Sequence, residues 1–134
     1  MKRFTPFVCS LLLVSSAWAV DTRLHGDYRE YATTGTATTM SETFDPPNHV
    51  KLLEIRVGLF GTASDTVTCM LDSHLGVNYD TQVTAFTASA DGTTTTGLKQ
   101  LDPPVILNKD DALVLTSGDF STTYTLQILY EILN

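Results

Sequence analysis

The chain has 134 residues, enough for one domain, and it carries eight lysines and arginines against fifteen aspartates and glutamates, for a net charge of −7. Nucleic-acid binding needs clustered basic side chains to replace the counterions of the phosphates, so this balance argues against a nucleic-acid partner and, equally, against an anionic membrane surface. Threonine is frequent and occurs in runs such as residues 93–96. Because β-branched side chains crowd a helix and pack well on a pleated sheet, the composition favours a β protein.

Residues 1–19 have the pattern of a secretory signal peptide. Lys2 and Arg3 form a positive start, an apolar run follows at residues 7–14, and Ala17-Trp18-Ala19 supplies small residues at the two positions that a signal peptidase reads. The apolar run is shorter than the ~20 residues that a membrane-spanning helix needs, so we expect cleavage after Ala19 and export to the periplasm or the outside of the cell. A retained hydrophobic N-terminal segment is the alternative.

Cleavage would leave 115 residues with six basic and fifteen acidic side chains, and it would remove Cys9. Cys69 would then be the one cysteine of the mature chain, so no intrachain disulfide could form. Because Cys69 alternates with Val67 and Leu71, we expect a buried thiol that packs as a small hydrophobe.

Residues 20–47 are expected to form an N-terminal arm. The segment 27–31 is charged and aromatic, and a Thr/Gly/Ala stretch with weak alternation follows it, which suits one strand. Arms of this kind can add to the sheet edge of a neighbouring molecule. The β-sandwich domain itself is expected at residues 48–134.

Two-residue alternation of apolar side chains, the period of a half-buried strand, recurs along this domain. It is strongest at residues 122–133, where the inward set is Tyr124, Leu126, Ile128, Tyr130 and Ile132. In residues 50–60 the predicted inward set is Leu53, Ile55, Val57 and Leu59, which turns Leu52 outward. The inward sets of residues 66–72 and 77–86 are Val67, Cys69 and Leu71, and then Val77, Tyr79, Thr81, Val83 and Ala85.

Polar segments separate these strands at residues 61–65, 72–76, 87–97, 108–111 and 117–119. Asp-Pro-Pro occurs at residues 45–47 and 102–104, and each copy should be a stiff bend that leads into a strand at an end or an edge of the sandwich. Short strands with closely spaced turn signals predict an all-β fold. We expect a single antiparallel β-sandwich of the jelly-roll or Greek-key type.

No residue pattern in the domain indicates catalysis. His25, His49 and His74 lie at least 24 residues apart, without a second His or Cys at metal-ligand spacing, so we expect neither a metal nor another cofactor. Asp72-Ser73-His74 contains the residue types of a catalytic triad, but three consecutive residues rarely place the base between the acid and the nucleophile. A calcium site in the acidic turns and a carboxylate pair for glycan cleavage are the weaker alternatives. The expectation is a protein that is not an enzyme.

A binding surface is expected in loops at the ends of the sandwich, because such loops vary without disturbing the core. The candidate loops are residues 73–78, 87–97 and 118–122. Among the aromatic residues, Tyr28, Tyr31, Tyr79 and Phe120 are the best candidates to reach a surface, where such rings suit a sugar or a protein partner. Packing in the core or at an edge is the favoured interpretation of these rings. The candidate binding residues are Ser73, His74, Asn78, Asp91, Gly92, Asp119 and Phe120.

From Val50 to Ile132 the chain resembles small jelly-roll proteins encoded beside the structural genes of tailed phages and related viruses. The segments that carry the resemblance are Leu52-Leu53-Glu54-Ile55-Arg56-Val57, Val67-Thr68-Cys69-Met70-Leu71-Asp72-Ser73, Tyr79-Asp80-Thr81, Pro103-Pro104-Val105-Ile106-Leu107, Gly118-Asp119 and Tyr124-Thr125-Leu126-Gln127-Ile128-Leu129-Tyr130. The resemblance implies a virion-associated component, such as a capsid decoration protein or a spike-like accessory. It further implies a homo-oligomer, or a protein that packs on a capsid lattice.

An export signal is unusual for a virion protein that assembles in the cytoplasm, and β-sandwiches also serve as adhesins and sugar-binding modules. An exported adhesin-like or carbohydrate-binding module, with a glycan as its partner, is therefore the alternative.

Overall fold

The structure, a computed structural model, describes residues 28–37, 39–118, 120 and 122–133. The signal peptide expected at residues 1–19, with Cys9, and the candidate residue Asp119 lie outside the described residues. In the described part, the one helix is a three-residue 3₁₀ turn, and no helix is long and apolar enough to cross a membrane.

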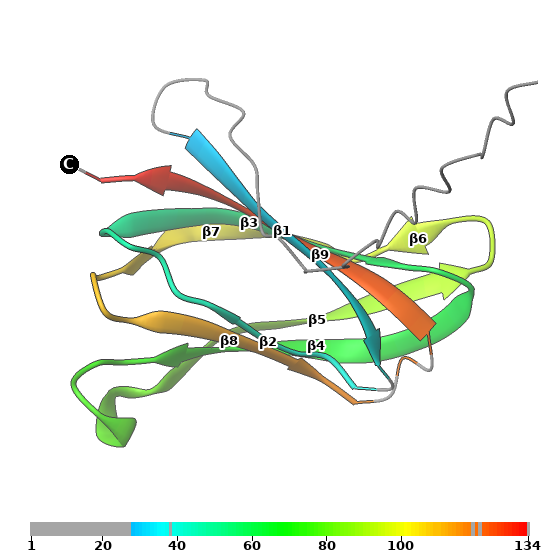
Figure 1. The fold of residues 1–134 in the computed structure, drawn as a ribbon, viewed down its shortest axis with the longest axis horizontal. Coiled ribbons are helices and arrows are strands. Elements are labelled where there is room, and N and C mark those ends of the chain that lie inside the picture. The colour runs from blue at the N-terminus through cyan, green and yellow to red at the C-terminus, as the bar shows by residue number, and fades with distance from the viewer. Residues whose placement is uncertain (1–27, 38, 119, 121, 134) are drawn as a thin grey trace, which may run out of the picture.

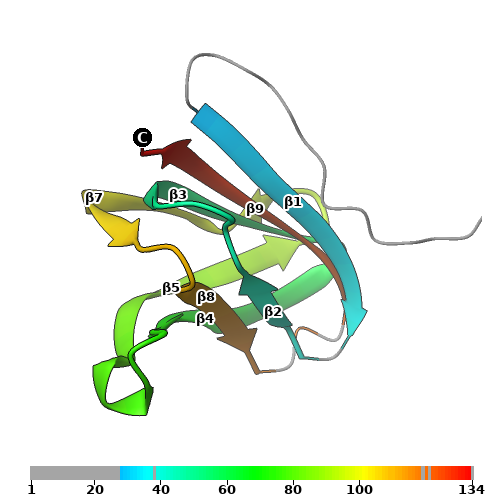
Figure 2. The same cartoon turned by 60° about the vertical axis from the view of Figure 1, so that its left-hand side comes forward.

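The strands form two antiparallel sheets that lie face to face (Figures 1 and 2). The four-stranded sheet has the order β1 (Tyr28–Ala37), β9 (Thr122–Ile132), β3 (Val50–Leu59) and β7 (Leu98–Leu107). The five-stranded sheet has the order β2 (Ser41–Phe44), β8 (Ala112–Ser117), β4 (Thr62–Asp72), β5 (Thr81–Asp91) and β6 (Thr95–Thr96).

The pairing of the strands is nested. When the two-residue strand β6 is set aside, the first strand pairs with the last, β2 with β8, β3 with β7, and β4 with its neighbour β5. A long hairpin folded over on itself gives this order, which is that of a jelly roll built from two Greek keys. The predicted fold class is confirmed.

The apolar core lies between the two sheets, where the alternation of the strands places it. In β9 the predicted inward residues Tyr124, Leu126 and Ile128 are buried, and Tyr130 and Ile132 pack against the core. In β4, Val67 and Cys69 are fully buried and Leu71 is half-buried against them. The predicted inward faces of these two strands are therefore confirmed.

In β3 the predicted inward face is correct in one half of the strand and wrong in the other. Val50 and Leu52 are buried, Leu53 is half-buried, and inward burial resumes at Ile55. The register with both β7 and β9 shifts between Leu52 and Glu54. This β-bulge adds one residue and reverses the alternation, which a continuous two-residue pattern could not anticipate.

The region between β4 and β6 also differs from the prediction. Val77 and Tyr79 belong to the 3₁₀ turn η1 (Val77–Tyr79) and not to a strand, and Ala85 is exposed. β5 begins at Thr81 and continues to Asp91, so most of the polar loop expected at residues 87–97 is strand. Ala88 is fully buried there, because small and β-branched residues can hold a strand without a strong apolar alternation.

The described part of the expected N-terminal arm is built into the sandwich. It contributes two strands, β1 to one sheet and β2 to the other, instead of the single strand expected. Phe44 in β2 is buried, and its ring lies 5.2 Å from that of Tyr31 in β1 and 5.0 Å from that of Tyr130 in β9. In the described residues the sandwich thus begins at Tyr28, earlier than the expected boundary at residue 48.

The two Asp-Pro-Pro segments have different positions. Residues 45–47 connect β2 to β3, as expected, whereas Asp102-Pro103-Pro104 lies inside β7 and contains a cis peptide bond. β7 is an edge strand. Val105 pairs with Leu52 of β3, and the next paired residue of β7 is Gln100, opposite Glu54, so the pairing skips residues 101–104 of β7. Proline suits such an edge because it has no N–H to donate to the sheet.

Candidate functional site

The predicted binding loops lie at opposite ends of the sandwich. Leu71 pairs with Thr81 and Asp72 pairs with Ala112, so residues 73–80 and the turn 108–111 share one end. Thr62 pairs with Asp91, which places the turn 92–94 at the other end, toward which β8 ends and β9 begins (Figure 1). Ser73, His74 and Asn78 are therefore separated from Asp91, Gly92 and Phe120, and the described candidate residues do not form one site.

The three described candidates at the far end have structural roles. Oδ1 of Asp91 accepts hydrogen bonds from the backbone N–H groups of Thr93, at 2.9 Å, and Thr94, at 2.8 Å, and these bonds hold the pKa of Asp91 well below its usual range. Gly92 adopts a φ of 90° in the same turn. Phe120 is buried, 6.2 Å from the ring of Tyr124, so it packs in the core, which is the favoured interpretation of the ring, and it is not available as a binding residue. A large ring after a polar turn is driven into the core by its own apolar area.

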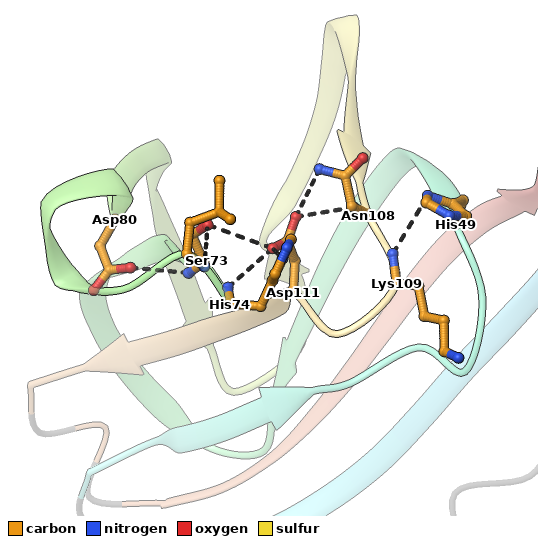
Figure 3. Close-up of polar contacts among 8 residues, drawn as sticks. His49, Ser73, His74, Asp80, Asn108, Lys109 and Asp111 are labelled. Carbon is orange, nitrogen blue, oxygen red and sulfur yellow. Dashed lines mark hydrogen bonds and ion pairs between the residues drawn. The ribbon is translucent and has the colours of Figure 1, made fainter.

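At the near end, a buried carboxylate connects two loops (Figure 3). Asp111 follows the β7–β8 turn and is 2% exposed. Its Oδ1 accepts the backbone N–H of His74 at 3.1 Å, contacts Nδ1 of the same residue at 2.6 Å, and accepts the hydroxyl of Ser73 at 3.5 Å. Its Oδ2 accepts the backbone N–H and the side-chain amide of Asn108, both at 3.0 Å.

The charge of Asp111 is supported by these donors. Burial alone would raise the pKa of Asp111, but the hydrogen bonds from His74 and Asn108 outweigh it and lower the pKa to about 2. A carboxylate with several donors is held ionised in this way. Asp111 therefore acts as a fixed anchor for the loop that begins at Ser73.

Further contacts hold this loop in one conformation. The backbone N–H of Ser73 donates to Oδ1 of Asp80 at 2.9 Å, which ties the start of the loop to its end. Backbone bonds of 2.9 Å, from Gly76 to Ser73 and from Tyr79 to Gly76, close two tight turns between them. Gly76 has a φ of 103°, in the left-handed region that favours glycine.

Three large apolar side chains of the same loop are exposed. Leu75 is 61% exposed, Val77 is 82% exposed and Tyr79 is 57% exposed. We call these three side chains the apolar tip. The loop that carries them, drawn in green between β4 and β5, projects beyond the end of the five-stranded sheet (Figures 1 and 2).

The apolar tip was only partly foreseen from the sequence. The candidate binding loop at residues 73–78 includes Leu75 and Val77, but the alternation pattern also predicts an inward strand face for Val77 and Tyr79. The anchor Asp111 was missed as well. The signals that could have revealed them were the glycine at position 76 and the Asn-x-x-Asp spacing of residues 108–111, which are typical of turns.

Ser73, His74 and Asp111 do not have the geometry of a catalytic triad. The hydroxyl of Ser73 and Nδ1 of His74 both point to the same oxygen of Asp111 (Figure 3), and Ser73 Oγ also accepts the backbone N–H of Leu75 at 3.3 Å. In a triad the imidazole lies between the acid and the nucleophile. In the part of the chain that the structure describes, no three His, Cys, Asp or Glu residues gather as a metal site.

A shallow hollow with charged walls lies on the outer face of the four-stranded sheet. It is lined by Glu30, Glu54, Arg56, Gln127 and Leu129. Glu54 is mostly buried there and forms an ion pair with Arg56. Within the hollow, the Glu54 carboxylate is therefore already paired with Arg56.

The fold and the anchored loop define the chain as a jelly-roll β-sandwich with an apolar end loop. No family model matches the sequence, and no curated protein matches it. Among solved structures, a chain in "Structure of infectious bursal disease virus Gx strain" superposes with a TM-score of 0.31 and 12% sequence identity. The match covers 79% of the present chain and 30% of that chain, so the present chain spans less than a third of the viral chain's length.

Proposed function

We propose that this protein is a non-enzymatic structural or accessory component of a virion, in the manner of a capsid decoration or spike-like protein, that self-associates and docks on a protein surface through its apolar tip. The nested strand order supports the proposal because viral capsid subunits are among the proteins that use jelly rolls. The resemblance of residues 50–132 to phage-encoded jelly-roll proteins supports the same class.

The observation that carries the docking function is the apolar tip. Single exposed apolar side chains are common on soluble proteins, but contiguous apolar patches mark interaction sites. Here three large side chains within five residues are exposed on a loop whose backbone is anchored to a buried carboxylate. Because the loop is ordered before binding, little conformational entropy is lost on docking.

Density-gradient fractionation of particles from the source organism tests this function. A tagged copy of the chain should sediment with the particles, and the variant Leu75→Ser/Val77→Ser/Tyr79→Ser should remain at the top of the gradient. The matched control is Phe60→Ser/Leu98→Ser, which removes two similarly exposed apolar side chains, 57% and 56% exposed, outside the loop. Wild-type protein that never enters the particle fractions would overturn the proposal.

An exported carbohydrate-binding or adhesin-like module is the second candidate, favoured by one observation. The ring of Tyr79 is 57% exposed on a rigid loop, and an exposed aromatic face suits a sugar ring. Lectin domains also use jelly rolls. Binding to a glycan array that is lost in Tyr79→Ser, together with absence from particles, would favour this candidate.

A further inference from the structure

Each sheet of the sandwich has two edges, and they differ in how they are protected against pairing with another chain. In the five-stranded sheet, β2 has four residues and β6 has two. Because β6 pairs only with Ser89 and Ala90, residues 81–88 of β5 also lie at this edge, but the pairing of β5 with β4 is irregular, with a register shift between Cys69 and Met70. In the four-stranded sheet, β7 is interrupted at Asp102-Pro103-Pro104, where its register breaks. Short edges, prolines and irregular register are the devices by which proteins prevent edge-to-edge association.

The fourth edge, β1, has none of these devices. It runs for ten residues from Tyr28 to Ala37 and pairs with β9 in unbroken register along its whole length. It contains no proline and no lysine. In the described part of the chain it has a strand partner on one side only. Every second residue of β1 directs its backbone N–H and C=O away from β9, and these groups can therefore bond to an added strand.

We propose that β1 is the self-association surface and that a second copy of this chain adds its own β1 antiparallel to it. Two identical antiparallel strands are self-complementary, so the contact closes as a two-fold dimer. The two four-stranded sheets would join into one continuous sheet. This inference rests on the self-association in the proposed function and names the surface that performs it.

Charge favours a second copy at this edge. The chain carries a net charge of −7, but β1 contains one arginine and one glutamate, Arg29 and Glu30, so the strand itself is neutral. Opposite residues of an antiparallel pair lie on the same face of the sheet, so the two-fold axis must pass through a residue position. With the axis at Ala32, residues 28–36 all have a partner. In that register Arg29 faces Gly35 of the second copy and Glu30 faces Thr34, so like charges do not lie opposite each other.

The size of the contact predicts a reversible dimer. A ten-residue strand is about 33 Å long, and an edge pairing of that length lies at the small end of specific interfaces. We therefore expect a dissociation constant on the order of micromolar. Sedimentation velocity of the exported chain from about 1 to 200 µM, its N-terminus established by mass, should show the monomer convert to a dimer in that range.

Proline substitution locates the interface. Successive N–H groups of a strand point to opposite edges, so of Ala32→Pro and Thr33→Pro one removes an N–H that faces β9 and the other an N–H that faces outward. The outward variant should keep the circular dichroism spectrum of the wild type and lose at least tenfold in dimer affinity. The Leu75→Ser/Val77→Ser/Tyr79→Ser variant is the control and should still form the dimer.

Amide hydrogen exchange provides a measurement without substitution, since alternate amides of β1 should become protected as the concentration rises. A monomer at every concentration would overturn the inference, as would a dimer that both proline variants retain or one that only the loop variant loses. A strict monomer that still sediments with particles would overturn this inference and leave the docking function of the loop intact.

Discussion

The hydroxyl of Tyr124 donates a 2.6 Å hydrogen bond to Oε1 of Glu42, and this bond joins the two sheets, because Tyr124 belongs to β9 and Glu42 to β2. Tyr124 is buried at the end of the core. Burial, together with the hydrogen bond to Glu42 and its negative charge, raises the pKa of Tyr124. The phenol therefore remains a neutral donor, and the seam between the sheets near β1 and β2 is fixed by a charge-assisted bond.

Removal of this hydroxyl should destabilise the fold. Tyr124→Phe leaves the Glu42 carboxylate without its donor, and a hydrogen bond to a charged group contributes about 1.5–3 kcal/mol. We expect the free energy of unfolding, measured by urea denaturation at neutral pH, to fall by about 2 kcal/mol. The control Tyr79→Phe, at an exposed hydroxyl, should change it by less than about 0.5 kcal/mol. Equal urea midpoints for Tyr124→Phe and Tyr79→Phe would show that the hydrogen bond between Tyr124 and Glu42 does not stabilise the fold.

The Tyr124 ring also explains why Gly35 lies opposite it in β1. A Cβ at position 35 would lie 2.6 Å from Cε1 of Tyr124 and closer still to the end of the ring. Because the hydroxyl is bonded to Glu42, the ring cannot move away cheaply. We expect Gly35→Ala to lower the free energy of unfolding by about 2–3 kcal/mol, as overpacking does.

Gly58→Ala is the matched control for this substitution. A Cβ at Gly58 would meet Oγ1 of Thr125 at 2.6 Å, which is a single rotatable hydroxyl. Its cost should be below about 1 kcal/mol, offset in part by the lower entropy of the unfolded alanine chain. If chemical denaturation gives the two glycine variants the same stability, the ring at Tyr124 is not the cause.

The sequence predicted the fold class because most inward faces follow an unbroken two-residue period. In β9, Tyr124 and Ile128 could be assigned by counting alone. Counting failed at Leu53, where a bulge adds a residue without any change in composition. It failed again at Val77, because an alternating apolar pattern cannot distinguish a strand from an exposed loop whose shape is set by distant partners.

The candidate site was less predictable than the fold for the same reason. His74 could be named as a loop residue, but its partner Asp111 lies 37 positions away, and only the packing of β4 beside β8 brings them together. Asp91 was correctly placed near a turn, yet its carboxylate is used by the turn itself. Local sequence shows which residues could bind, and tertiary contacts determine which of them remain available.

Cys69 should be inert in the folded protein. It is fully buried in β4, and burial raises the pKa of its thiol to about 12, so both access and the thiolate fraction are low. In the Cys9→Ser variant, Cys69 is the one remaining thiol. We expect a disulfide reagent to modify Cys69 at least 100-fold more slowly in the folded protein than in the protein unfolded in urea. Fast stoichiometric modification of the native protein would show that the thiol is accessible after all.

Asp111 should make stability depend on pH in a defined window. Its pKa in the folded protein is about 2, below the ordinary value of 3.8, so folding favours the ionised form. The stabilising contribution is then fully present above about pH 4 and is lost as the pH falls through about 2. At neutral pH, Asp111→Asn should lower the free energy of unfolding by about 2–3 kcal/mol, because charge-assisted bonds from two loops are lost.

The control for this prediction is the neighbouring exposed acid. Asp110→Asn removes the same charge from the same turn, and asparagine tolerates the φ of 74° found there. Urea denaturation of the wild type and both variants, repeated between pH 7 and pH 2, separates the two residues. The difference between Asp111→Asn and the wild type should shrink as the pH falls below 4, whereas Asp110→Asn should follow the wild type throughout. If the free energies of unfolding of the wild type and Asp111→Asn differ by the same amount at every pH, the ionised carboxylate of Asp111 does not anchor the loop.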